Sequence, residues 1–497
     1  MISTNYIVAI DLGTSYIKGI IGVRSHAGIF TVIACEAESS ANCIRRGVVY
    51  NVENTANRIT TLLRKLANKA PGVQIKKVYV GVGGQSIRSI DHVVVNSLGA
   101  DSEVRKETID ALYKECQAFK PDGLEALSIV SPTFYLDGNQ ENNPVGIPCS
   151  RIEAHYKLIV CRPSLKRHVM NSIAERAKIE IQGIFISPLA LADVVLSEDE
   201  KDLGCALLDF GAGIASLTIF KSKRLIRLCT IPLGSHLITR DLTSLHIVES
   251  EAERLKKTYG DATADRENDS SVQVNSINGA GIRQIKLSEI NEVVEARLQE
   301  ILENVQARLV ESGIVGKLNA GMIITGGGAS LKNFDEAVRE RFGTTVRYAA
   351  VNKTFFEKTS APIEPEFGVV AGLLLKGTMN CSYTPPVSSP VNRVDAKVHA
   401  VVDVEKQKEK EKQNELEKER ERERLRIREQ VRRDVESEIK QPGGRGKKSR
   451  RFFDKMAGFA NKLFDDKDYE DIKKKEDDAW ENETEKREIN NSDKQEE

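Results

Sequence analysis

Short apolar runs and longer stretches with apolar residues at helical spacing alternate over roughly the first 380 positions of the chain. Runs rich in branched residues, as at 7–10, 205–208 and 322–324, indicate buried strands. Further strands are predicted over 29–37, 76–81, 127–136 and 154–161, and helices over 51–70, 106–119, 163–178 and 287–310. This mixture predicts an α/β protein.

The first apolar run ends in a turn that is suited to phosphate. Asp11 closes the strand, Gly13, Thr14 and Ser15 follow, and the apolar pattern resumes at Ile17. Backbone N–H groups and hydroxyls at such a tip can surround a phosphate, since glycine leaves room for close approach. Lys18 adds a positive charge, and the Asp11 carboxylate could hold a metal ion through water. An ordinary hairpin has the same local pattern.

The pattern recurs, which makes it more specific. At 205–220 an apolar strand ends in Asp209, a turn of Gly211, Ala212 and Gly213 follows, and a second strand returns. At 322–334 a strand leads into a turn of three glycines, Gly326, Gly327 and Gly328. Three turns in this order resemble the nucleotide clamp of the actin-like ATPase superfamily.

That resemblance implies an actin-like (ribonuclease H-like) two-lobe ATPase fold whose cofactors are ATP and Mg²⁺. The two hairpins would hold the phosphates, Asp11 and Asp209 would hold the metal through water, and the three glycines would lie against adenosine. Glu253 and Lys256 share a helix face, and in the superfamily a Glu and a Lys from this helix reach the ribose and purine. A surface ion pair is the alternative for these two. No catalytic residue is assigned.

Residues 86–163 do not fit plain actin. Strand, helix, strand and strand follow one another there, and such an inserted α+β subdomain resembles the FtsA family of cell-division proteins; a long decorated loop is the alternative. The implied domains are a lobe-one core (1–85, 164–203), the insertion (86–163), a lobe-two core (204–240, 311–378) and a small subdomain of lobe two (241–310). The polar stretch 261–276 within the small subdomain is predicted to be a mobile loop.

Two departures from hydrolytic relatives predict weak or absent ATPase activity. The position before Pro188, where those relatives carry a carboxylate or amide that orients water, is Ser187. A serine hydroxyl is a poor general base near neutral pH. Ala212 and Ile214 also replace a glycine and a threonine of the common second turn.

The resemblance implies that the small subdomain binds the acidic, apolar C-terminal tail of FtsZ, the tubulin-like division protein. Arg283 lies just before the helix 287–310 and Arg297 lies on it, and arginine suits carboxylate ligands. A merely solvated surface is the alternative.

Composition changes after 378. Residues 379–446 predict a linker and charged spacer, 447–466 an amphipathic membrane-targeting helix, and 467–497 a disordered acidic tail. An aromatic and aliphatic face beside basic residues is typical of a helix that lies in the surface of anionic membranes. A helix that docks on another protein or on the core is the alternative. The residues assigned to lipid are Arg450, Arg451, Phe452, Phe453, Lys455, Met456, Phe459, Lys462, Leu463 and Phe464.

Composition also limits the possible partners, the cysteine chemistry and the kind of membrane contact. The 73 basic residues balance the 73 acidic ones, so bulk charge predicts no nucleic-acid partner. The eight cysteines form no C-x-x-C pair and are expected to be buried free thiols. No segment reaches the roughly 20 apolar residues of a spanning helix, so membrane contact is expected to be peripheral.

Together these features imply an ATP-binding division protein on the cytoplasmic face of the inner membrane at the septum. It would tether FtsZ, polymerise with itself, bind anionic lipid and recruit later division proteins. Pilus-assembly or cell-shape actin homologues, and sugar or acetate kinases of the superfamily, are the rival assignments.

Overall fold

The computed structural model describes residues 5–25, 27–40, 42–99, 102–263, 270–275, 282–357 and 361–383. All of them belong to the first of two compact units, 1–386 and 387–497. The predicted spacer, membrane helix and acidic tail lie outside the described residues.

Lobe one is built on a five-stranded sheet with the order β12-β7-β1-β2-β3. β1, β2 and β3 form an antiparallel meander, while β7 and β12 run parallel to β1. The bounds are β1 Tyr6–Leu12, β2 Tyr16–Arg24, β3 Phe30–Ser39, β7 Lys77–Val82 and β12 Glu180–Ile186. Ile7, Val8, Ala9 and Ile10 are fully buried, as the branched apolar run predicts.

Lobe two repeats this order as β19-β18-β13-β14-β15. β13, β14 and β15 form the meander, and β18 and β19 run parallel to β13. The bounds are β13 Cys205–Phe210, β14 Ala215–Lys221, β15 Arg224–Ile231, β18 Met322–Thr325 and β19 Val346–Tyr348. Asp11 and Asp209 therefore occupy equivalent positions near the ends of equivalent central strands.

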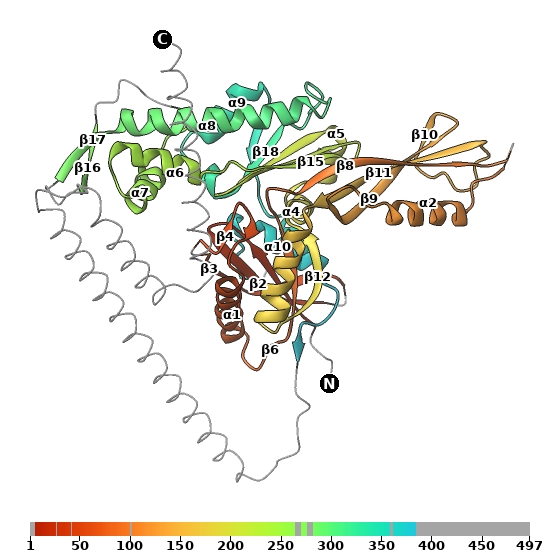
Figure 1. The fold of residues 1–497 in the computed structure, drawn as a ribbon, viewed down its shortest axis with the longest axis horizontal. Coiled ribbons are helices and arrows are strands. Elements are labelled where there is room, and N and C mark those ends of the chain that lie inside the picture. The colour runs from red at the N-terminus through yellow and green to blue at the C-terminus, as the bar shows by residue number, and fades with distance from the viewer. Residues whose placement is uncertain are drawn as a thin grey trace, which may run out of the picture. The chain divides into compact units, whose positions relative to one another are not determined.

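The insertion extends the lobe-two sheet. Its strands have the order β10-β9-β11-β8, and β8 joins β15 through one bridge between Arg88 and Cys229 (Figure 1). The bounds are β8 Arg88–Ser97, α2 Lys106–Ala118, β9 Glu125–Leu136, β10 Asn139–Glu141 and β11 Arg151–Cys161. The insertion has its own apolar core, around Tyr156 and Leu158. It is thus a packed α+β module and not a decorated loop.

Helices connect and cover the two sheets. α1 begins at its N-cap Asn51, whose side chain accepts the Asn54 N–H. The helices of the lobe cores are α1 Val52–Lys69, α3 Pro163–Met170, α4 Ser187–Val195, α5 Glu198–Leu203, α9 Phe334–Phe342 and α10 Gly368–Lys376. The short strands are β4 Ile44–Arg45, β5 Val48–Val49, β6 Gln74–Ile75 and β20 Ser382–Tyr383.

The small subdomain of lobe two contains a hairpin that the sequence analysis missed. Its elements are α6 His236–Leu242, α7 Glu249–Tyr259, β16 Ser271–Asn275, β17 Ile282–Lys286 and α8 Leu287–Val310. β16 pairs with β17, so the prediction of a mobile loop throughout 261–276 is wrong. Asp261, at its start, is buried and accepts hydrogen bonds from Asn333 and Thr263.

In the described ranges, no helix is both long and apolar enough to cross a bilayer. All eight cysteines are free thiols; seven are buried and Cys35 is partly buried.

The crossing of α4 and α10 depends on Gly372. A Cβ atom there would lie 1.9 Å from the backbone oxygen of Ala190 on α4. Gly372→Ala should therefore lower the free energy of unfolding by roughly 1–3 kcal/mol, as overpacking does. Chemical denaturation would measure this loss. Gly368→Ala, on the same helix, is the matched control because its one close contact would be the flexible tip of Leu191, at 2.9 Å, with Val195 and Val351 at 4.0 Å. Equal stability of the two variants would contradict the packing argument.

Candidate functional site

One cavity of about 600 Å³ lies between the two lobes and is lined by all three glycine turns. Every residue that the sequence analysis assigned to the nucleotide contributes to this lining. These are Asp11, Gly13, Thr14, Ser15, Lys18, Asp209, Gly211, Ala212, Gly213, Glu253, Lys256, Gly326, Gly327 and Gly328. Residues from four separate parts of the chain thus meet at one cavity.

Two carboxylates define one end of the cavity. Burial and, to a smaller extent, the nearby charge of Asp11 raise the pKa of Asp209 to about 6, against the charge of Lys18. Burial also raises the pKa of Asp11, against the hydrogen bond from Ser187 and the charge of Lys18. Two desolvated carboxylates that repel each other favour a cation at this end.

The first turn is held by groups outside it. The Ser40 hydroxyl donates to Gly13 O at 2.7 Å, and Thr14 Oγ1 accepts the Gly47 N–H at 3.0 Å. Gly47 lies in the hairpin of β4 and β5 and also lines the cavity, although the sequence analysis did not single it out. The turn is therefore braced before any ligand arrives.

Lys18 is directed toward the segment that precedes α10. Its ammonium donates to the backbone oxygen of Glu366 at 2.6 Å and lies 3.7 Å from the Glu366 carboxylate. It also lies 5.4 Å from the centre of the Phe367 ring. Glu366 lines the cavity as well and was not predicted.

Ser187 contacts the cavity carboxylates directly. It is buried, and its hydroxyl donates to Asp11 Oδ1 at 2.7 Å. The side chain at the position before Pro188 therefore orients a carboxylate, and its proton is already engaged.

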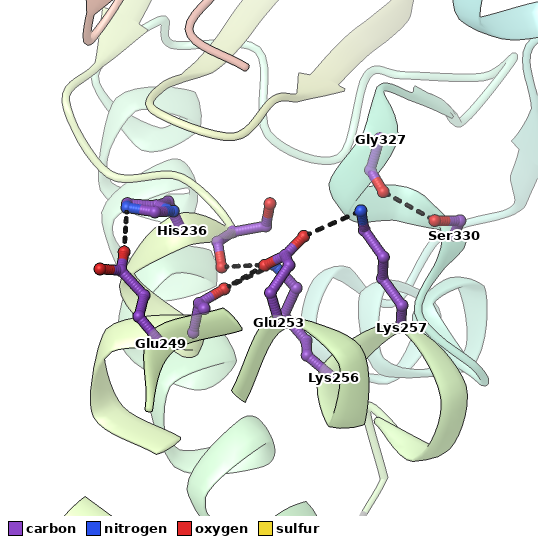
Figure 2. A network of polar contacts seen from close by, with 9 residues as sticks. His236, Glu249, Glu253, Lys256, Lys257, Gly327 and Ser330 are labelled. Atoms are coloured by element: carbon purple, nitrogen blue, oxygen red, sulfur yellow. Dashed lines mark hydrogen bonds and ion pairs between the residues drawn. The ribbon is translucent and has the colours of Figure 1, made fainter. Parts of the chain in front are cut away.

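Helix α7 supplies a polar network to the cavity lining (Figure 2). The buried Lys256 ammonium donates to Glu253 Oε2 at 2.6 Å, to Thr239 Oγ1 at 2.8 Å and to Ser235 O at 3.2 Å. These three acceptors match its three N–H groups. Burial lowers the pKa of Lys256, and the Glu253 carboxylate opposes this shift. Lys256 thus mainly positions Glu253 and joins α7 to α6.

Lys257 was not predicted, although it lies four residues after Glu253 on the same helix. It is exposed, lines the cavity and pairs with the second oxygen of Glu253 at 3.2 Å. Gly327 and Ser330, which Figure 2 also labels, line the same cavity. Both lysines line the cavity, and Lys257 is the exposed one of the two.

The glycine turn after β18 packs on the end of β13. Gly326 has φ +93°, and a Cβ there would lie 2.4 Å from the backbone oxygen of Phe210 and 2.5 Å from Asp209 Oδ1. A side chain would therefore displace the Asp209 carboxylate, which explains why glycine is required.

Two further predicted residues, Arg283 and Arg297, do not line this cavity. Arg297 pairs with Asp241 and Glu300 of its own subdomain, so its guanidinium is already neutralised. Arg283 is exposed and donates to Leu245 O at 2.9 Å. All the residues assigned to lipid, Arg450 to Phe464, lie outside the described residues.

The raised pKa of Asp209 generates a stability prediction. The folded chain holds the Asp209 proton more tightly than the unfolded chain, where the pKa is near 3.8. Above pH 6 the folded state therefore retains a poorly solvated charge. Asp209→Asn should raise the free energy of unfolding of the ligand-free protein by roughly 2 kcal/mol at pH 7.5. This gain should shrink as the pH falls through 6 and vanish near pH 4.

Denaturation at several pH values would check this, with the exposed Asp202→Asn as control. A gain that does not depend on pH, or a loss of stability at pH 7.5, would refute the prediction.

Comparisons with known proteins agree with this geometry. The family model described as cell division protein FtsA matches residues 206–372, and the model of the SHS2 domain inserted in FtsA matches residues 84–160. The cell division protein FtsA of Porphyromonas gingivalis is 33% identical over 393 residues, which cover 78% of this chain and 82% of that protein. The Bacillus subtilis FtsA is 29% identical, covering 69% and 78%.

Among solved structures, a chain of the PilM–PilN type IV pilus biogenesis complex matches with a TM-score of 0.51 at 17% identity. The match covers 74% of this chain and 98% of that one, and it shows a shared fold. The fold is the actin-like one that the sequence predicts, and the chain belongs to the FtsA family of cell-division proteins.

Proposed function

We propose that this chain binds ATP with Mg²⁺ between its lobes and acts as a nucleotide-dependent adaptor that holds FtsZ at the membrane. The nucleotide assignment rests on one observation. Asp11 and Asp209 lie near the ends of equivalent strands in two sheets of the same topology, and both line the same cavity. Glycine turns follow both carboxylates, and backbone N–H groups at such turns can bind phosphate, although the Gly211 N–H already donates to Ile214 O at 2.9 Å.

The chemistry of the donor set fits Mg²⁺. This ion prefers oxygen ligands, keeps several waters, and is held in nucleotide sites by one or two carboxylates together with phosphates. Asp11 and Asp209 would hold it. Burial raises both pKa values, and the charge of Asp11 adds to the shift at Asp209; a divalent ion would favour the ionised form of both carboxylates. When bound, the ion would neutralise phosphate charge.

The adenosine end is formed by α7 and the three-glycine turn. Glu253 is held in place by Lys256 and Thr239, and its carboxylate is available to ribose hydroxyls. Burial alone would raise the pKa of Glu253, but the bonds from Lys256 and Thr239 outweigh burial and lower it. The carboxylate therefore stays ionised as an acceptor.

We propose that hydrolysis is slow or absent. Ser187 cannot accept a proton near neutral pH, and its own proton is committed to Asp11. The site favours binding over turnover, so we expect less than about one turnover per second, the low end of ordinary enzyme rates.

The proposed binding partners are those that membership of the FtsA family implies. The small subdomain would take the FtsZ C-terminal tail, and Arg283 suits a carboxylate better than Arg297, which is already paired. Self-association into filaments and recruitment of later division proteins complete the proposed role. The amphipathic stretch 450–464 would bind anionic lipid on the cytoplasmic face of the inner membrane at the septum.

Nucleotide binding can be tested by calorimetry with ATP, with and without Mg²⁺. Asp11→Asn should weaken Mg²⁺-ATP binding at least about tenfold, because one of two metal-holding carboxylates is lost. Chelation of Mg²⁺ should have a similar effect on the unsubstituted protein. Asp202→Asn is the control. Equal affinity of Asp11→Asn and unsubstituted protein for Mg²⁺-ATP would argue against the assignment.

Membrane binding can be tested by flotation with vesicles that contain anionic lipid. Deleting 450–464 should release the protein from the vesicles, since the basic and apolar residues both lie in this stretch. Deleting 470–484, a tail segment of the same length, should leave flotation intact. The assignment fails if the first deletion floats as well as the full chain.

A further inference from the structure

His236 lines the cavity but has no role in the account above. It is the first residue of α6, and 47% of its side chain is exposed. The sequence analysis did not single it out, because nothing near it in the chain marks a site.

The backbone around His236 packs on the second glycine turn. The Ser235 N–H donates to Gly211 O at 3.0 Å, and the His236 N–H donates to Ala212 O at 2.8 Å. A Cβ at Gly234 would lie 2.4 Å from Ala212 O, so the approach is very close. The backbone that carries the imidazole is therefore held against the turn that is proposed to face phosphate.

The imidazole is also oriented by a carboxylate. His236 Nε2 lies 3.0 Å from Glu249 Oε1, at the start of α7, as Figure 2 shows. If Nε2 donates to this carboxylate, Nδ1 can donate to a phosphate oxygen only when the ring carries a proton on both nitrogens.

The two lobes supply unequal groups to a phosphate chain. Lobe one has the hydroxyls of Thr14 and Ser15 and, opposite Asp11 in the hairpin, the cation Lys18. In lobe two the turn carries no hydroxyl, and the residue opposite Asp209 is Ser216. The lobe-two hairpin therefore lacks the positive charge that its counterpart has.

We propose that His236, oriented by Glu249, is the cationic phosphate-binding side chain of lobe two. It would donate a charge-assisted hydrogen bond to the phosphate chain of the nucleotide, from the side opposite Lys18. This inference rests on the proposed function, because it assumes that the cavity takes ATP.

Calorimetry of the full chain with Mg²⁺-ATP and, separately, with adenosine tests the proposal. His236→Ala should bind ATP about tenfold more weakly, as expected for the loss of one hydrogen bond to a charged group, and adenosine as well as before. Glu249→Gln, which loosens the imidazole without removing it, should have a smaller effect on ATP and none on adenosine. The unsubstituted protein should take up protons on binding ATP, seen by comparing buffers of different ionisation enthalpy, and His236→Gln should not.

Unchanged ATP affinity in His236→Ala would overturn the inference. An equal loss of ATP and adenosine binding would also overturn it, since that result marks a structural role; thermal unfolding of the variant would confirm that reading. If the unsubstituted protein binds no ATP, the proposed function fails and this inference with it. If the unsubstituted protein binds ATP and His236→Ala is unaffected, this inference alone fails.

Discussion

The repulsion between Asp11 and Asp209 is the constraint on which the rest of the site depends. Each carboxylate ends a central strand that is buried on both faces, so neither strand can withdraw its acid without disturbing a core. Burial raises both pKa values, and the charge of Asp11 adds to the shift at Asp209. The fold thus maintains an electrostatically unfavourable arrangement that a bound divalent cation and phosphates would relieve. Such retained strain is common where stability is traded for binding.

The surrounding side chains are arranged for holding a ligand. The Ser187 hydroxyl donates a hydrogen bond to Asp11. The Lys256 ammonium donates hydrogen bonds to Glu253, Thr239 and Ser235. Groups that are already hydrogen-bonded are rigid, and rigid groups lose little entropy when a ligand binds. The adaptor role proposed here would need a nucleotide that stays in place and links the two lobes, and these hydrogen bonds suit that task better than rapid turnover.

Much of the fold and of the cavity could be predicted because the evidence for them is local. Asp11 and Asp209 each end an apolar run and precede a small-residue turn, and the three glycines follow a strand directly. What escaped prediction depends on contacts between distant segments. β16 has only Val272 and Val274 as apolar residues and forms because β17 pairs with it. The local sequence also does not predict the hydrogen bonds from Lys256 to Ser235 and Thr239, or the ion pair between Arg297 and Asp241. The β-bridge between Arg88 and Cys229, one of the contacts that join the insertion to lobe two, has no sequence signal either.

The central claim is that one metal-bound nucleotide lies between the two equivalent hairpins, β1–β2 and β13–β14. A crystal of the protein grown with Mn²⁺ and a non-hydrolysable ATP analogue, measured at a wavelength where manganese scatters anomalously, tests it most directly. The account predicts one anomalous peak between the carboxylates of Asp11 and Asp209, with the phosphates beside it and adenosine against Gly326–Gly328. A nucleotide bound elsewhere, or a cavity with no metal between the two carboxylates, would contradict it.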